Sequence, residues 1–155
     1  MQTHILLEGI SVIRSANATA AGTTPINGSS IDMQTLGARA LLCIACLGAL
    51  TSTQVTKLKL QGSDDNSTWA DLTHTDYSVT SQAVATAAAA DADGNKMLVL
   101  DCKRISHRYV RPVLVRGTAN AVLDSLVSIP YEFSVMPAPA ADATVSQQAK
   151  FTDAA

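Results

Sequence analysis

Residues 54–61 have the sequence Gln54-Val55-Thr56-Lys57-Leu58-Lys59-Leu60-Gln61. Thr56, Leu58 and Leu60 alternate with long polar side chains, and this period of two is typical of a β-strand with one buried and one solvated face. The next residues are turn formers whose short side chains bond to their own backbone, Gly62-Ser63-Asp64-Asp65-Asn66-Ser67. An extended pattern resumes at Trp69, so we predict that Gln54–Leu72 forms a β-hairpin.

Further short strands, separated by polar turns, are predicted on both sides of this hairpin. They are Ile5–Ile13, Ser30–Met33, Arg39–Leu47, Asn95–Asp101, Tyr109–Arg116 and Ala121–Phe133. Arg39–Leu47 is apolar on both faces and could equally be a helical turn, but its position before the hairpin favours a strand. Pro112 indicates that its strand is an edge strand or carries a bulge, and Pro130 predicts a bend in the last strand.

The segments between these strands are rich in small residues. Ser15–Ser30 is interpreted as a loop or irregular ribbon, and the Ala-rich Ser81–Asp93 as a long surface connection. The fold class is therefore predicted to be all-β, with a single antiparallel β-sandwich (jelly-roll-like) over residues 29–135. Residues 1–28 form an N-terminal strand and irregular arm in this prediction, and residues 136–155 an extended C-terminal arm.

The composition of the 155 residues excludes several classes of protein. Ala, Ser and Thr make up 55 residues, charged residues only 15% and aromatic residues 4%, and the net charge is −2. This charge gives no general attraction to nucleic acids or anionic membranes. The longest apolar run, residues 40–50, is too short for a bilayer, and no signal peptide is evident at the N-terminus. Low charge beside 47% hydrophobic residues indicates a surface that other protein covers.

The three cysteines do not form a recognisable redox or metal motif. Cys43 and Cys46 have the spacing of a C-x-x-C motif, but they lie inside an apolar run and would face opposite sides of a strand. With Cys102 they leave an odd thiol, so we interpret them as small apolar residues of a protein assembled in a reducing cytoplasm.

The sequence predicts neither an enzyme nor a cofactor or metal site. Residues 64–66 and 91–95 resemble calcium loops only superficially, because they lack the spacing of ligands that such loops require; turn formation explains both. His4, His74 and His107 lie far apart and have no nucleophile motif nearby. Glycines occur singly, so no phosphate-binding loop is predicted.

One local concentration of charge remains, because five of the eleven Lys and Arg residues fall between positions 103 and 116. Arginines beside a tyrosine could bind phosphate or stack on bases, or they could pair with carboxylates within the subunit or across an interface. The acidic balance of the whole chain favours pairing. Trp69 could be an interface anchor or could cover the end of the core. The predicted interface residues are Trp69, Lys103, Arg104, Arg108, Tyr109, Arg111 and Arg116.

Four segments of the chain resemble small structural proteins of tailed bacteriophages. They are Ser30-Ile31-Asp32-Met33, which leads to an apolar strand, the hairpin Lys59-Leu60-Gln61-Gly62-Ser63-Asp64-Asp65-Asn66-Ser67-Thr68-Trp69-Ala70-Asp71-Leu72, and the two segments Lys96–Asp101 and Arg108–Pro112. The resemblance covers roughly residues 29–145, and the hairpin is its most specific part. The family that it indicates is that of the capsid decoration, or cement, proteins.

This resemblance implies a β-sandwich without catalytic residues that binds the outer surface of a phage capsid. The implied partners are further copies of the chain, as a homotrimer, and the major capsid protein, and the implied location is the virion. The hairpin also occurs in other phage proteins, so a tail or head-completion role is the alternative, and a nucleic-acid-binding module that uses Arg104–Arg116 is a weaker one.

Overall fold

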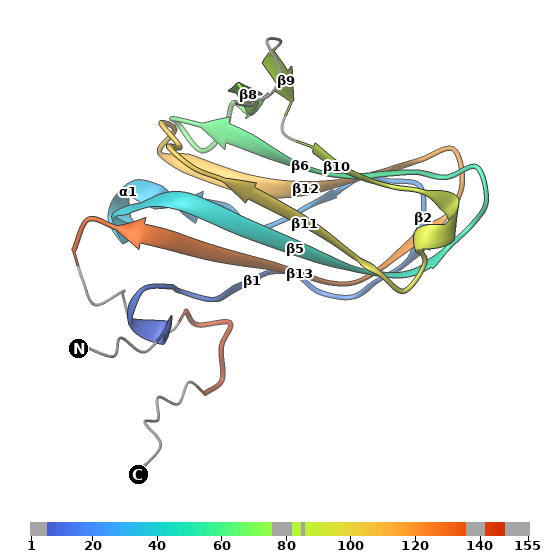
Figure 1. Cartoon of the computed structure of the whole chain (residues 1–155), viewed down its shortest axis with the longest axis horizontal. Helices are drawn as coiled ribbons and strands as arrows, with labels where there is room; N and C mark the ends of the chain where they lie inside the picture. Colours follow the sequence, from blue (N-terminus) through green and yellow to red (C-terminus); the bar gives the residue numbers. More distant parts are fainter. Residues whose placement is uncertain (1–5, 76–81, 85, 136–141, 148–155) are drawn as a thin grey trace.

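The computed structural model describes residues 6–75, 82–84, 86–135 and 142–147, which form two antiparallel sheets packed face to face (Figure 1). Sheet A has the strand order β1 (Ile13–Ala16), β13 (Ala121–Phe133), β5 (Ala38–Leu50) and β11 (Met97–Cys102), with β2 (Thr19–Gly22) also on β13. Sheet B has the order β10 (Thr86–Ala89), β6 (Val55–Ser63), β12 (Tyr109–Gly117) and β3 (Ile26–Asn27), with β4 (Ile31–Asp32) on β12 and β7 (Ala70–Asp71) on β6. The prediction of an all-β sandwich is confirmed.

The remaining elements are short. β8 (Thr73–Thr75) and β9 (Gln82–Val84) form a separate hairpin. The helical elements are η1 (Leu6–Glu8), α1 (Met33–Leu36) and η2 (Asp91–Asp93). Within the described part of the chain, none of these is long and apolar enough to cross a membrane.

The predicted hairpin is present. Thr56, Leu58 and Leu60 on β6 are at most 1% exposed and face the core, while Lys57 is exposed on the opposite face. β7 pairs with the end of β6. Between the two strands, the Asp65 carboxylate accepts hydrogen bonds from the backbone N–H groups of Ser67 and Thr68, which fixes the turn.

β5 confirms the strand reading of the second apolar stretch. Its inward side chains, among them Leu41, Cys43 and Leu47, are at most 2% exposed and form the core with the inward side chains of β6, β12 and β13. The outward side chains alternate with them, so Cys43 and Cys46 point to opposite faces as expected. All three cysteines are free; burial raises the pKa of the Cys43 thiol to about 12. Cys46 is only partly buried, unlike the interior thiol that we expected.

Two segments differ from the prediction. The Ala-rich stretch is not a surface connection throughout, because Thr86–Ala89 forms β10 and pairs with β6 from Ala89↔Thr56 to Thr86↔Lys59. The first strand begins at Ile13, where the predicted strand Ile5–Ile13 ends. Leu6–Glu8 form a 3₁₀ turn that Gly9 closes by donating its N–H to the Leu6 carbonyl (2.9 Å), and Ile5 lies outside the described residues.

The two prolines also have consequences other than those expected. Pro112 lies in an interior strand without a bulge, between β6 and the pair β3 and β4. Its carbonyl accepts a hydrogen bond from the N–H of Gly28 (2.8 Å), so its nitrogen faces the same side, where the neighbouring chain is interrupted between β3 and β4. Because proline has no backbone N–H, it loses no hydrogen bond between strands at a position where the neighbouring strand is interrupted. Similarly, β13 continues through Pro130, and its register shifts lie at residues 121–125.

The segment interpreted as an irregular ribbon links both sheets. After β1, the chain pairs with β13 through β2 and then with β12 through β3 and β4, so residues 13–32 pass from sheet A to sheet B. Of the predicted C-terminal arm, only residues 142–147 are described; there Thr144 Oγ1 accepts a hydrogen bond from the Arg14 N–H on β1 (2.9 Å).

Candidate binding surface

The predicted interface residues are brought together only in part. Trp69 and Arg111 lie on the outer face of sheet B, and Arg108 and Tyr109 lie at the end of the sandwich where β12 begins. Lys103 and Arg104 belong to the exposed loop before β12. Arg116 is inside the protein.

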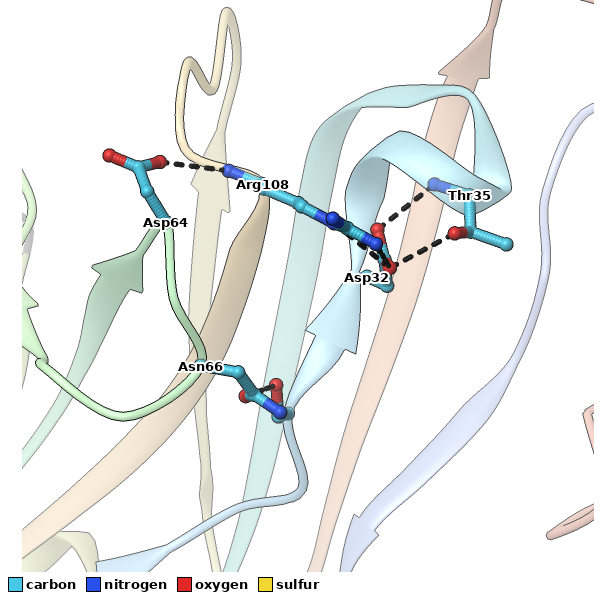
Figure 2. Close-up of polar contacts among 6 residues, drawn as sticks. Asp32, Thr35, Asp64, Asn66 and Arg108 are labelled. Carbon is cyan, nitrogen blue, oxygen red and sulfur yellow. Dashed lines mark hydrogen bonds and ion pairs between the residues drawn. The ribbon is translucent and has the colours of Figure 1, made fainter.

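Arg108 closes a polar network at this end of the sandwich (Figure 2). Its Nη2 and Nε donate to Asp32 Oδ2 at 3.0 and 3.2 Å. Asp32 also caps α1, because its carboxylate accepts hydrogen bonds from the Thr35 N–H (3.0 Å) and hydroxyl (2.9 Å). Pairing of this arginine within the subunit was one of the two readings of the basic cluster, and the structure confirms it.

The turn of the hairpin joins the same network. Asp64 Oδ1 accepts a hydrogen bond from the Arg108 N–H (3.3 Å) and lies 3.3 Å from His107 Nδ1. The Ser30 hydroxyl donates to Asn66 Oδ1 (2.6 Å) (Figure 2). Three segments far apart in the sequence are therefore held together at one end of the sandwich, namely residues 30–35, 63–68 and 107–109.

A second group forms a strip on the outer face of sheet B. The Arg111 guanidinium lies 4.3 Å from the centroid of the Trp69 ring and donates to Gln61 Oε1 at 2.8 and 3.0 Å. Gln61 donates in turn to Asp71, which also pairs with Lys59 at 2.8 Å. We call Trp69, Arg111, Gln61, Asp71 and Lys59 the Trp69 strip. Partial burial lowers the pKa of Arg111, and the Lys59 ammonium lowers the pKa of Asp71.

Lys103 lies close to the end of sheet A. Its ammonium is 3.2 Å from Glu132 and 5.6 Å from the centroid of the Tyr131 ring. Arg104 is exposed and has a φ of 57°, which places it in the left-handed region. These two residues remain at the surface, as an interface role would require.

The placement of Arg116 corrects the expectation for this residue. It is only 6% exposed, and its guanidinium donates to the carbonyls of Thr24, Ala20 and Ala121 at 2.8 to 2.9 Å. A buried side chain whose donors are used inside the protomer offers no contact surface to a partner.

Sequence reasoning missed the partners of the predicted residues. Asp32, Asp64 and Asp71 were seen only as parts of short motifs, and Gln61 only as an outward residue of a strand. The contact of Gln61 could have been anticipated from strand pairing. When a later strand pairs with the hairpin strand, each outward side chain of one strand lies opposite an outward side chain of the other. The register Arg111↔Gln61 is such a cross-strand pair.

The chemistry of this surface is that of recognition by shape, stacking and hydrogen bonding. A shallow open depression beside the strip is lined by residues of the hairpin turn and by His107. Among the residues searched, which are those the structure describes, no group of three or more His, Cys, Asp or Glu side chains is placed to hold a metal ion. The Trp69 strip combines an aromatic ring, a stacked guanidinium and an amide, which can stack and form hydrogen bonds.

The ion pair between Asp32 and Arg108 predicts a loss of stability in acid. The hydrogen bonds that the Asp32 carboxylate accepts from Arg108, and to a smaller extent those from Thr35, lower the pKa of Asp32 from 3.8 to about 2. Between these values the unfolded chain binds a proton that the folded protein does not, so the free energy of unfolding falls as the pH falls from about 4 to about 2. With solvent screening of this partly exposed pair, the contribution is about 1 kcal/mol, fully present above pH 4.

The measurement is the free energy of unfolding of wild type and of Asp32→Asn between pH 2 and 7. The variant should be less stable at pH 7 and should have a flatter profile below pH 4. Asp124→Asn, an exposed aspartate on β13, is the control and should follow the wild-type curve. Parallel curves for wild type and Asp32→Asn would contradict the assignment.

No protein-family description matches the chain. No curated protein matches it significantly. Among solved structures, the chain is similar to the crystal structure of SPBc2 prophage-derived protein YomS, with a TM-score of 0.46 and 16% sequence identity, over 78% of this chain and 91% of that chain.

Proposed function

We propose that this protein is a structural component of a bacteriophage virion that binds the outer surface of the capsid as a decoration protein. In this role it strengthens the joints between subunits of the major capsid protein and performs no catalysis. A tail or head-completion role is the alternative within the same class of protein.

The observation that carries the proposal is the form of the hairpin Lys59–Leu72. This hairpin is the most specific part of the resemblance to decoration proteins, and four residues of the Trp69 strip come from it. Arg111 from β12 contacts the Trp69 ring and holds it at the surface, where Trp69 remains partly exposed. Trp and Arg are the residue types that most often dominate the energy of protein–protein interfaces.

The charges of the basic cluster support a protein partner over a nucleic acid. A phosphate-binding surface needs several unpaired cations on one face. Here Arg116 is buried, Arg108 is paired with Asp32, and Lys59 with Asp71. The remaining exposed cations belong to a chain of net charge −2, so the protein as a whole does not attract the phosphates of a nucleic acid.

The test is co-sedimentation with purified heads of the phage whose genome encodes the protein, after heads lacking it have been prepared. Wild-type protein should sediment with heads, and Trp69→Ala should bind about tenfold or more weakly because it removes a predicted anchor. Lys96→Ala changes an exposed residue next to η2 at the other end of the sandwich, and should bind as wild type does.

Circular dichroism and thermal unfolding must show that both variants are folded. Absence of sedimentation with heads would overturn the decoration role. Equal binding by Trp69→Ala and wild type would remove the Trp69 strip from the contact. Binding to DNA that weakens steeply with salt would favour the nucleic-acid alternative.

A further inference from the structure

The outer face of sheet A is apolar, although one face of a solvated antiparallel sheet normally carries polar residues. Directly opposite residues in neighbouring strands share a face, so the register gives three rows across the sheet. The rows are Met97–Cys46–Ser125, Val99–Ile44–Val127 and Asp101–Leu42–Ile129. We call these nine residues the sheet A face; seven of them are apolar or cysteine.

The sheet A face is open to solvent, and its area is comparable to the apolar centre of a protein–protein interface. Met97 is 63% exposed and Val99 is 52% exposed, while the five others of apolar character are partly exposed. With strands about 4.8 Å apart and residues about 3.3 Å apart, the face with its flanking strand β1 measures roughly 300 Å² in projection. The largest apolar patch on a typical soluble monomer has about this size and is often a functional contact surface. The apolar centre of a standard interface has this size, within about 800 Å² per partner.

Opposite charges border the face on its two edges. Asp101 lies on the edge strand β11, and Arg14 lies on the edge strand β1 opposite Val127, one row away from the row of Asp101. The Asp101 carboxylate accepts a hydrogen bond from the Tyr131 hydroxyl through one oxygen, and the Arg14 guanidinium donates to Asn17 through one nitrogen, so each group keeps further atoms for a partner. Three strand spacings, about 14 Å, separate these two edges in one protomer. Arg14 and Asp101 are therefore too far apart to pair within one protomer. A second copy related to the first by rotation about an axis parallel to the strands would place its β1 edge against the β11 edge of the first. Such a rotation keeps positions along the strands, so corresponding rows of the two copies lie at the same height.

We propose that the sheet A face binds a second copy of this chain in a cyclic assembly whose axis runs parallel to the strands, so that Arg14 of each copy meets Asp101 of another. The apolar rows then form the centre of the interface and the Arg14–Asp101 pairs its border. A second copy fits better than an unrelated partner, because the face carries its own complementary charges at the positions that such an axis brings together. This inference goes beyond the proposed function and does not depend on it.

The first test compares two exposed valines of the purified protein. Val99→Asp places a charge in the centre of the sheet A face. Val55→Asp is the control, because it places the same charge at a valine of β6 in sheet B that is 40% exposed. Sedimentation equilibrium should show that wild type and Val55→Asp self-associate, and that Val99→Asp raises the dissociation constant about tenfold or more. In wild type, Cys46 should react more slowly with a thiol reagent as the protein concentration rises.

The second test exchanges the border charges. Arg14→Asp and Asp101→Arg should each weaken self-association about tenfold, because each creates like-charge contacts at every border. An equimolar mixture of the two variants restores opposite charges between unlike copies. Association should recover fully in a dimer and in part in a three-membered ring, in which one like-charge contact remains.

Three results would overturn the proposal. They are a wild-type protein that stays monomeric up to millimolar concentration, equal association by Val99→Asp and Val55→Asp, and no recovery in the mixture. Circular dichroism excludes unfolding as the cause. These experiments contain no phage heads, so their failure would leave the decoration role to be judged by co-sedimentation.

Discussion

Replacing Arg116 by methionine is expected to lower the free energy of unfolding by about 2–4 kcal/mol. Methionine keeps most of the apolar stem but removes every donor of the guanidinium. Three backbone carbonyls, those of Ala20, Thr24 and Ala121, then lose a charged hydrogen bond, which is buried at Ala121 and partly buried at the other two. Chemical denaturation of wild type and variant at neutral pH measures the loss.

The position of the loss is as informative as its size. Residues 19–24 contact the rest of the protein through β2, which pairs with the irregular start of β13, and through Arg116. Amide hydrogen exchange should therefore increase first at β2 and at the start of β13, before the central strands open.

Two arginine variants control this experiment. Arg104→Met changes an exposed arginine of the loop before β12, at the opposite end of this strand from Arg116, and should cost less than about 0.5 kcal/mol. Arg116→Lys keeps the charge but cannot reach all three carbonyls with a planar fork, so its loss should be intermediate. If Arg116→Met were no more destabilising than Arg104→Met, the internal role of Arg116 would be wrong.

Arg116 also shows how far the sequence could predict the site. It was grouped with Arg108 and Arg111 because the three are close in sequence, and sequence distance says nothing about which face a side chain occupies. The alternation on β12 does: Val110 and Leu114 are buried, and Arg116 has the same parity. The burial of this arginine was therefore contained in the pattern, but the carbonyls that satisfy it come from residues far away.

The fold was predictable where the side-chain pattern is strong and local. The alternation in β6 and the turn formers after it determine the hairpin. β5 was assigned to a strand only from its position before the hairpin, because an apolar run does not reveal its period. The strand β10 was missed because alanine has no preference for strands; its pairing with β6 and the packing of Ala89 against the core depend on the tertiary structure. Likewise, Trp69 and Arg111 were both singled out, but their contact depends on the register between β6 and β12.

Replacing Gly28 by alanine is expected to lower the free energy of unfolding by about 2–3 kcal/mol, because the added methyl group overpacks a closed site. A Cβ atom at this position would lie 2.8 Å from Pro112 Cγ and 3.0 Å from the Pro112 carbonyl oxygen. The proline ring cannot rotate away, and the same oxygen accepts the hydrogen bond from the Gly28 N–H (2.8 Å). Relief therefore requires the link between β3 and β4 to move away from β12.

A matched glycine and a double-mutant cycle separate this clash from a general effect of alanine. Gly117, at the end of the same strand β12, has no heavy atom within 4 Å of a Cβ, so Gly117→Ala should change stability by less than about 0.5 kcal/mol. In a Pro112→Ala background the ring is absent, and Gly28→Ala should cost about 1 kcal/mol less than in the wild-type background. The part that remains reflects the carbonyl oxygen, which the second substitution leaves in place. An equal cost of Gly28→Ala in both backgrounds would show that the Pro112 ring does not require glycine at position 28.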